Sequence, residues 1–325
     1  RRRRVGSLSL GSDLILFEEK VGISPGIRAV GIDNRALDGS AYADTPLVTP
    51  DTSRQAAVSP RIGLLFRPTP HLTVKSTAGQ YLRPPDLAEL FGDRGGIMGN
   101  AALRPESGYQ IDGGVRWTHR GERASISVDV GGYLKRSTDL IVYEQNSQRT
   151  LTPRNVGDAR VLGAETATQL TLFDALEWNA NIALTDSENL ENEVAVYGNQ
   201  LPRVPTLAAQ NSLWLRAEDR IALGYQWSFT SGNYWDATNW YQAAPRSIHG
   251  TMLQLQPKPD WPRLELAVQN LTDRSTEVVP RNPLDPTDGS TITQSITDFV
   301  GYPLPGRTLL FSVRWSPQSH SREST

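Results

Sequence analysis

The chain of 325 residues lacks several features that mark familiar protein classes. It has no cysteine, which excludes disulfides, thiolate metal sites and cysteine nucleophiles. Its formal net charge is −2, so no basic surplus suggests binding to nucleic acid. No apolar run approaches the roughly 18 residues of a transmembrane helix. The sequence opens on Arg1–Arg4 rather than an apolar signal-peptide core, and these arginines fit a loop end, a strand start or a cloning remnant.

Catalytic and metal-binding patterns are also missing from the sequence. There is no G-x-S-x-G motif, and the four histidines lie in different segments, at positions 71, 119, 249 and 320. In the stretch DPTDG, Asp285 and Asp288 stand beside proline and glycine, which is more typical of a turn than of a calcium site. We therefore expect no enzyme, no cofactor and no bound metal.

The main positive feature is an alternation of apolar and polar residues with a period of two, which marks β-strands with two different faces. Leu223, Tyr225 and Trp227, for example, alternate with Gly224 and Gln226. About thirteen segments show the pattern, most of them near the roughly 9–11 residues of a membrane-spanning strand and longer than usual soluble strands. They cover residues 5–17, 23–34, 57–67, 71–81, 108–119, 123–143, 159–172, 175–185, 206–217, 220–230, 247–256, 262–270 and 306–315.

The connections between these segments alternate between short and long. The short ones lie near 18–22, 68–70, 120–122, 173–174, 218–219 and 257–261, and the long ones near 35–56, 82–107, 144–158, 186–205, 231–246 and 271–305. One rim of the sheet therefore carries tight turns and the other carries large loops. This arrangement predicts an all-β fold, an antiparallel transmembrane β-barrel of the bacterial outer membrane, with polar side chains toward the lumen and apolar ones toward lipid.

Tryptophan and strand number refine this interpretation. Five tryptophans lie near the short-turn rim and are expected to form a girdle at the membrane boundary: Trp117, Trp178, Trp214, Trp261 and Trp315. Single-chain bacterial barrels have an even number of strands, and an unpaired edge in hydrocarbon costs several kcal/mol per backbone group. We therefore expect a fragment without N-terminal strands, consisting of a partial barrel over 1–315 and a polar tail over 316–325.

Seven different short sequence motifs occur along the chain. They are SPR-x-GL at 59–64, R-x-P-x-x-x-EL at 83–90, GN-x-x-L-x-PE at 99–106, N-x-G…G-x-E at 155–165, P-x-x-P at 202–205, V-x-NL-x-D at 268–273 and G-x-P-x-PGR at 301–307. In this order and spacing they resemble the C-terminal part of the barrel of a TonB-dependent outer-membrane receptor. We expect a structural role for these of their residues: Arg83, Pro85, Glu89, Leu90, Asn100, Pro105, Glu106, Asn270, Leu271, Pro305, Gly306 and Arg307.

The resemblance implies a barrel of about 22 strands with an N-terminal plug, of which these segments would be the last. It implies import of a scarce large solute, such as a ferric siderophore or another metal chelate, or cobalamin, driven by the TonB energy-coupling complex. Outer-membrane lipid would be a further partner, and nucleic acid would not. The sequence shows neither a plug nor a TonB box, and it continues past Trp315, where the family tends to stop at an aromatic residue.

One long connection is a candidate for ligand contact. Residues 231–241 read SGNYWDATNWY, and exposed aromatic rings stack on flat or apolar ligands. The candidate ligand-binding residues are Tyr234, Trp235, Trp240 and Tyr241. The alternative is that these rings pack the loop against its neighbours. The connection at 82–107 is instead expected to be shaped by its prolines and glycines, without contact to ligand.

Two other interpretations stay open from the sequence. The first is a passive, porin-like channel without a plug. The second is a soluble β-rich binding protein or an enzyme with an alternating pattern of long strands.

Overall fold

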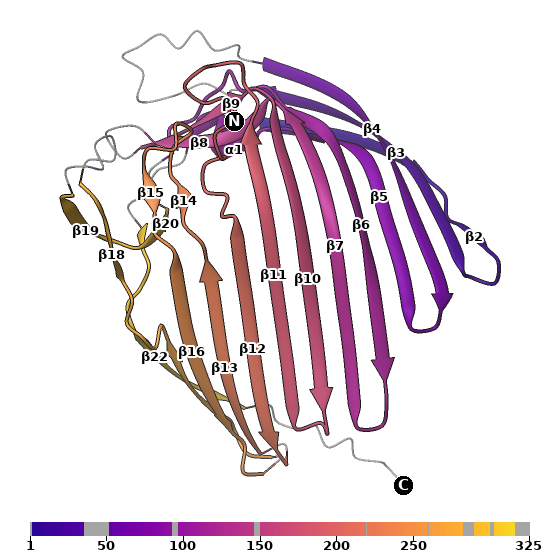
Figure 1. Cartoon of the computed structure of the whole chain (residues 1–325). Coiled ribbons are helices and arrows are strands. Elements are labelled where there is room, and N and C mark those ends of the chain that lie inside the picture. The colour runs from indigo at the N-terminus through magenta and orange to yellow at the C-terminus, as the bar shows by residue number, and fades with distance from the viewer. Residues whose placement is uncertain are drawn as a thin grey trace.

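A curved antiparallel sheet of long strands forms most of the protein (Figure 1). The structure is a computed structural model and describes residues 2–35, 52–92, 97–145, 150–218, 220–258, 260–281, 289–299 and 302–315. Asp285, Asp288 and the tail 316–325 lie outside these residues. In the described part of the chain, no helix is long and apolar enough to cross a membrane.

The sheet has 14 strands, of which all but one follow each other in chain order, the short β2 pairing beside β3. Its strands are β1 (Arg2–Gly11), β2 (Leu14–Leu16), β3 (Val21–Arg35), β4 (Thr52–Thr69), β5 (Leu72–Arg83), β6 (Glu106–Arg120), β7 (Ala124–Thr138), β10 (Ala159–Leu172), β11 (Leu176–Asn189), β12 (Leu207–Ala217), β13 (Ile221–Thr230), β16 (Arg246–Leu255), β17 (Arg263–Gln269) and β22 (Thr308–Arg314). Strands β1 and β22 form its two edges and are not paired with each other in the described residues.

Each predicted segment contains a strand of this sheet, but two of the predicted boundaries were wrong. The segment 123–143 is broken at Asp139, whose φ of 57° lies in the left-handed region and turns the chain out of the sheet. The segment 5–17 is divided between β1 and β2.

The long connections hold small elements that the alternation did not predict. They are α1 (Leu87–Phe91) and four two-stranded hairpins: β8 (Leu140–Gln145) with β9 (Leu151–Val156), β14 (Asn233–Tyr234) with β15 (Gln242–Ala243), β18 (Thr276–Pro280) with β19 (Thr291–Ser295), and β20 (Thr297–Phe299) with β21 (Tyr302–Pro303). These elements gather at the rim of the sheet that carries the long connections, called here the loop rim (Figure 1).

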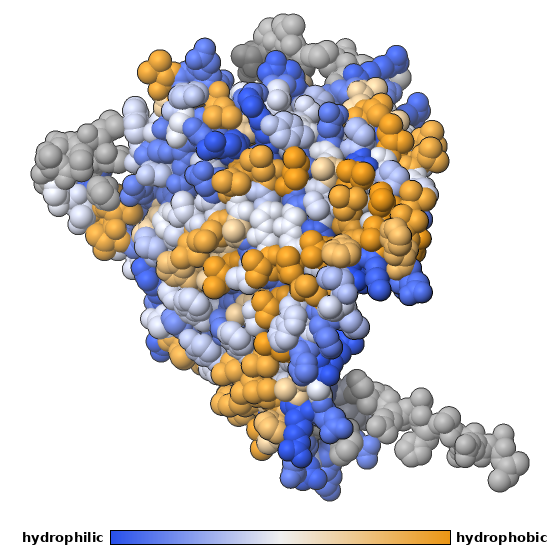
Figure 2. Space-filling view, turned by 45° about the vertical axis from the view of Figure 1, so that its right-hand side comes forward, coloured by the Kyte–Doolittle hydropathy of each residue, from blue (hydrophilic) through white to orange (hydrophobic). Residues whose placement is uncertain are grey.

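Alternation gives the sheet one apolar and one polar face. On β13, Ile221, Leu223 and Tyr225 share one face and are 48%, 48% and 39% exposed, an exposure of large apolar side chains that suits contact with lipid. Figure 2 shows apolar residues gathered in patches along the strands. Gln226 and Ser228 alternate with these residues and belong to the polar face.

The opposite rim, called here the turn rim, carries the tight turns. Between β10 and β11, Phe173 and Asp174 both have positive φ, at 51° and 54°, and the backbone N–H of Ala175 donates to the carbonyl of Leu172 at 3.0 Å, which closes a tight hairpin turn. Phe173 is 68% exposed at this rim. Such turns fix the register of the long hairpins and leave the opposite rim to carry the connecting segments.

The expected girdle of tryptophans holds only in part. Trp117 and Trp315 share the apolar face and are 43% and 64% exposed. Trp214 belongs to the polar face instead, because it lies opposite Gly224 and a Cβ added to that glycine would sit 2.8 Å from the indole ring. The guanidinium of Arg216 lies 5.8 Å from the Trp214 ring centroid. Trp214 is therefore removed from the predicted lipid-facing girdle.

Candidate functional site

The connection between β5 and β6, residues 84–105, starts with a short capped helix at the loop rim. Asp86 is the N-cap of α1, and its Oδ1 accepts a 2.7 Å hydrogen bond from the backbone N–H of Glu89. Glu89 Oε2 in return accepts a 2.7 Å bond from the backbone N–H of Asp86. This reciprocal pair satisfies two backbone donors that a helix start leaves without partners, so Pro-Pro-Asp-Leu-Ala-Glu forms a defined turn rather than a loose loop.

Arg83 links this helix to the wall of the sheet. Its Nη1 donates to both carboxylate oxygens of Glu89 at 3.0 and 3.1 Å, and its Nε donates to Glu106 Oε2 at 3.1 Å. Glu89 and Glu106 are only 3% and 2% exposed. Buried carboxylates need paired cations, so one guanidinium joins the R-x-P-x-x-x-EL and GN-x-x-L-x-PE elements into a single structure.

Three further side chains complete this network around Glu106. Lys135 Nζ donates to Glu106 Oε1 at 3.0 Å, and Tyr81 Oη donates to the same oxygen at 2.9 Å. Tyr81 Oη also lies 2.6 Å from Ser137 Oγ. The Tyr81 ring passes over Gly108, where a Cβ would come within 2.9 Å of it. We call Tyr81, Arg83, Glu89, Glu106, Lys135 and Ser137 the rim network.

The charge of Glu106 is maintained by its partners. Glu106 is the first residue of β6, a strand of 15 residues, and thus lies beyond the roughly 9–11 residues that span a membrane. Burial alone would raise the pKa of Glu106, but hydrogen bonding and the charge of Lys135, with help from Tyr81 and Arg83, lower this pKa below its ordinary value. Glu106 is therefore ionised at neutral pH.

The β5–β6 connection is also fixed to the β8–β9 hairpin. Leu90 and Leu103 form a small core with Ile141 of β8, and all three are at most 7% exposed. Asn100 Nδ2 donates to the carbonyl of Pro153 at 3.0 Å, and the backbone N–H of Asn100 donates to the carbonyl of Glu89 at 2.8 Å. These contacts hold the connection from both sides.

Three further residues explain why the connection has this sequence. A Cβ on Gly99 would collide with the backbone of Phe91 and Gly92, so only glycine lets the chain pass there. Pro85 is among the most completely buried residues, and its carbonyl accepts a hydrogen bond from the guanidinium of Arg3. Pro105 directly precedes Glu106 and leads the chain into β6.

The last two elements of the chain are joined in the same manner. Asn270 Nδ2 donates to the carbonyl of Pro305 at 3.2 Å, and the backbone N–H of Arg307 donates to Asp273 Oδ1 at 2.7 Å. A side chain at Gly306 would meet that Asp273 carboxylate at 2.8 Å. The side chain of Leu271 is not buried in this contact between the two motifs, since it is 43% exposed.

The aromatic connection between β13 and β16, residues 231–245, presents two of its four predicted rings to solvent. Trp240 and Tyr241 are 51% and 57% exposed, whereas Tyr234 and Trp235 are half-buried. Asp236 fixes the turn, because its carboxylate accepts from the backbone N–H groups of Trp240 and Tyr241 at 3.2 and 2.8 Å. Trp240 and Tyr241 are thus the better placed for ligand contact.

Neighbouring loops hold this aromatic connection in place. Asn239 exchanges two hydrogen bonds with Gln200 of the β11–β12 connection, of 2.8 and 2.9 Å. The Arg203 guanidinium, which the sequence did not single out, lies 5.6 Å from the Trp235 ring centroid. Trp235 therefore packs between loops, as the alternative interpretation of this segment predicts, while Trp240 and Tyr241 do not.

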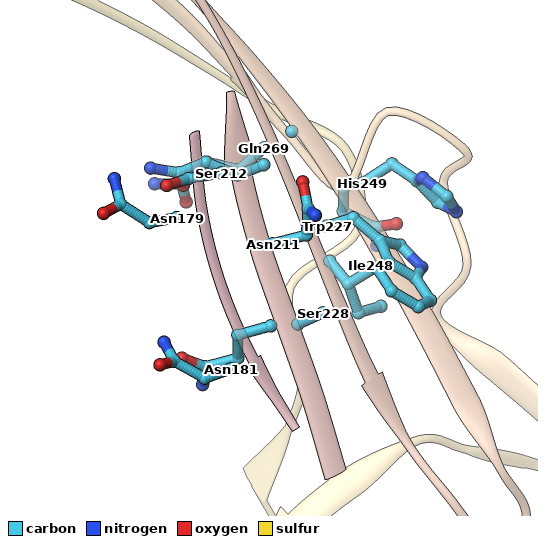
Figure 3. Close-up of a pocket in the computed structure, with 13 residues that line it drawn as sticks. Asn179, Asn181, Asn211, Ser212, Trp227, Ser228, Ile248, His249 and Gln269 are labelled. Carbon is cyan, nitrogen blue, oxygen red and sulfur yellow. The ribbon is translucent and has the colours of Figure 1, made fainter. Parts of the chain in front are cut away.

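A hollow of about 520 Å³ lies on the polar face below this connection (Figure 3). Asn179, Asn181 and Ser212 point to one side of the strands, and Trp227 and His249 point to the other (Figure 3). Amide and hydroxyl groups thus line the polar face here. The polar face was predictable from the sequence, but these individual side chains were not, because their only signal is their alternation with apolar residues.

The polar face carries charge nearer to β5–β7. There, Lys75 Nζ lies 2.9 Å from Asp129 Oδ1, and Arg116 contacts the same carboxylate. In the residues that the structure describes, no group of three or more His, Asp or Glu side chains is arranged to hold a metal ion.

Comparison with known proteins gives one family and a set of related folds. The family "TonB dependent receptor-like, beta-barrel" matches residues 5–271. No curated protein matches the chain. Among solved structures, the siderophore receptor PiuA from Acinetobacter baumannii is similar with a TM-score of 0.71 and 18% identity, over 96% of this chain and 43% of that one.

Two other solved structures show the same fold. The copper transporter OprC gives a TM-score of 0.67 at 19% identity, over 96% of this chain and 47% of that one. The ferric citrate transporter FecA gives a TM-score of 0.64 at 14% identity, over 96% of this chain and 45% of that one. The chain therefore spans less than half the length of these proteins. The family is one of non-enzymatic transporters, which confirms the expectation that the chain is not an enzyme. With its long antiparallel strands, its two unlike rims and its motifs joined at the loop rim, this chain belongs to the TonB-dependent receptors, as part of a β-barrel of the bacterial outer membrane.

Proposed function

We propose that the chain is the C-terminal part of the barrel of a receptor that imports a scarce large solute, such as a ferric siderophore or cobalamin, by TonB-dependent transport. The observation that carries the proposal is the family match over residues 5–271. The proposed division is a partial barrel over 1–315 and a polar tail over 316–325. A plug and a TonB box, supplied outside these residues, would couple the barrel to the TonB complex.

The loop rim would receive the solute. Trp240 and Tyr241 offer exposed rings on a turn that Asp236 holds rigid, so they can stack on a flat or apolar ligand with little loss of loop entropy. Below them, the hollow lined by Asn179 and Asn181 offers neutral hydrogen-bonding groups along the lumen wall. The rim network would supply a rigid frame beside the entry and would not contact the solute.

Uptake by cells tests the proposal. A strain without the gene that encodes this chain is compared with its parent for growth on a panel of ferric siderophores, ferric citrate and cobalamin. The proposal expects loss of growth on one chelate, restored by the gene and abolished again when TonB is removed. Uptake that persists without TonB, together with steady conductance in planar bilayers, would instead establish a passive channel.

A further inference from the structure

The outer surfaces of β1, β3 and β4 change from apolar to charged at one level. Gly6, Gly31 and Ala56 lie side by side in the register, and two residues farther toward the loop rim the next row is Arg4, Asp33 and Arg54. Toward the turn rim, the same face continues with these apolar side chains: Leu8, Leu10, Ile23, Ile27, Val58, Ile62, Leu64 and Phe66. The boundary therefore runs straight across three strands.

Arginine dominates the charged side of this boundary. Arg2 and Arg4 are exposed, and the side chain of Arg54 is 75% exposed. Asp33 is the carboxylate in this row, with its Oδ1 3.5 Å from Arg54 Nε. Arg3 belongs to the opposite face, where it donates to Asn34 Oδ1 at 2.7 Å. We call Arg2, Arg4 and Arg54 the arginine patch.

The level of the patch matches the outer edge of the bilayer. The apolar side chains of β3 run from Val21 at the turn rim to Gly31, a length that fits the roughly 9–11 residues of a tilted membrane-spanning strand. The turn rim faces the periplasm and the loop rim faces outward in such barrels. The arginine patch therefore lies at the height of the lipid headgroups of the outer leaflet.

A shallow hollow lies directly below the arginine patch on the same face. It has a volume of about 650 Å³, and its outward-facing lining consists of Gly6, Leu8, Ala29, Gly31, Ala56 and Val58. A Cβ added to Gly6 or Gly31 would meet nothing within 4 Å, so the surface is open there. An acyl chain fits such an apolar depression.

Two other arginines near the loop rim of this outer face are paired with carboxylates. Arg160 lies 2.7 Å from Glu188 and 3.5 Å from Asp186, and Arg136 lies 3.1 Å from Asp158. Among the residues that the structure describes, the arginine patch instead has three cations beside one carboxylate, and a guanidinium offers several donors to an anion.

We propose that the arginine patch binds the phosphate group of an anionic lipid in the outer leaflet, with one acyl chain of that lipid in the hollow below. Guanidinium groups match phosphate oxygens with paired hydrogen bonds, and near a membrane each basic residue strengthens binding to anionic lipid. The site lies on the outside of the barrel wall. It is therefore independent of the solute that passes through the lumen.

Lipid binding by the chain tests this proposal without any transport. The receptor that contains these residues is purified in detergent and mixed with phosphatidic acid or phosphatidylcholine, and bound lipid is counted by native mass spectrometry. We expect preferential retention of phosphatidic acid, which the combined substitutions Arg2→Gln, Arg4→Gln and Arg54→Gln weaken by about tenfold or more. The matched control, Arg136→Gln with Arg160→Gln, should change retention less than about twofold, because those cations are already paired.

A second variant guards against a failure of the first to fold. Gly31→Phe fills the hollow and leaves every arginine in place, and we expect it to weaken retention of long-chain but not short-chain phosphatidic acid, with an unchanged circular dichroism spectrum. Retention by a folded arginine variant within about twofold of the parent would overturn the proposal. Displacement of the lipid by equimolar inorganic phosphate would also overturn it, because the site would then recognise a soluble anion.

Discussion

Two long connections at the same rim are built in opposite ways. The β5–β6 connection buries its charged residues, Glu89 and Glu106, against Arg83 and hides Leu90 in a small core. The β13–β16 connection exposes Trp240 and Tyr241 and is fixed mainly by hydrogen bonds from backbone groups to Asp236. In the β5–β6 connection, the charged side chains are buried in contacts within the protein. In the β13–β16 connection, two aromatic side chains remain exposed to solvent.

The difference separates a connection with a structural role from one that can contact a solute. In the β5–β6 connection, Glu89, Leu90 and Glu106 are nearly inaccessible, so their side chains are not placed to contact a solute. The exposed rings of the β13–β16 connection match no family motif. A substitution should therefore act on stability in one connection and on solute affinity in the other.

Removal of Arg83 should break the first connection most severely. Arg83→Met leaves two buried carboxylates without this cation. We expect a loss of about 2–4 kcal/mol, somewhat less than the roughly 3–5 kcal/mol for a fully buried pair, because the Arg83 side chain is 40% exposed. Urea unfolding of the refolded chain in detergent measures the change. Arg104→Met is the matched control, since its partner Asp139 lies in a surface pair, and it should cost less than about 1 kcal/mol. Equal losses in the two variants would contradict a special role for the rim network.

A smaller effect is expected at the crossing of the chain beside α1. Gly99→Ala places a Cβ against the backbone of Phe91 and Gly92, which must shift, at a cost of about 1–3 kcal/mol. Gly31→Ala on the outer face is the control, because its Cβ would meet nothing within 4 Å. The same unfolding assay should separate the two variants, and a neutral Gly99→Ala would show that the connection is less tightly packed than this structure indicates.

The sheet could be predicted from the sequence because its physical cause is local. A period of two, strand lengths suited to a bilayer and alternating connection lengths are all readable residue by residue. The break at Asp139 could not be predicted in this way, because it depends on one left-handed φ value that the neighbouring residues do not indicate. Trp214 was misassigned for a different reason. Its neighbours Leu213 and Leu215 belong to the apolar face, so the alternation places Trp214 on the polar face even though it lies near a turn.

The rim network was only half predictable. Arg83, Glu89 and Glu106 were selected by resemblance, yet the reason for them is a contact across two strands and a helix. Lys135 joins them because β7 pairs with β6 in one register, and that register is set by a turn far away at the other rim. Contacts between distant segments of this kind have no local signature in the sequence.

Substitutions in the second connection should act on affinity. Trp240→Ala combined with Tyr241→Ala removes two exposed rings, and we expect stability to change by less than about 0.5 kcal/mol, while affinity for the transported solute falls about tenfold. Binding of the chelate identified by the uptake experiment is measured on whole cells. Phe173→Ala, an exposed ring on the turn rim, is the control and should leave affinity unchanged. A double variant with parental affinity would remove Trp240 and Tyr241 from the binding site.

The smallest expected effect is in the pH dependence of the unfolding free energy, which tests the charge of Glu106 in the β5–β6 connection. The lowered pKa of Glu106 means that its ionised form stabilises the folded state, and this contribution is fully present above the ordinary carboxyl pKa of about 4.5. It is lost as the pH falls through the lower pKa of the folded state. Glu106→Gln cannot titrate at this position, so the difference in unfolding free energy between parent and variant should be constant from pH 7 to pH 5 and shrink below about pH 4.5. A difference that stays constant down to pH 3 would show that Glu106 contributes by packing and hydrogen bonding alone, and that the charge in the rim network is not what holds the β5–β6 connection.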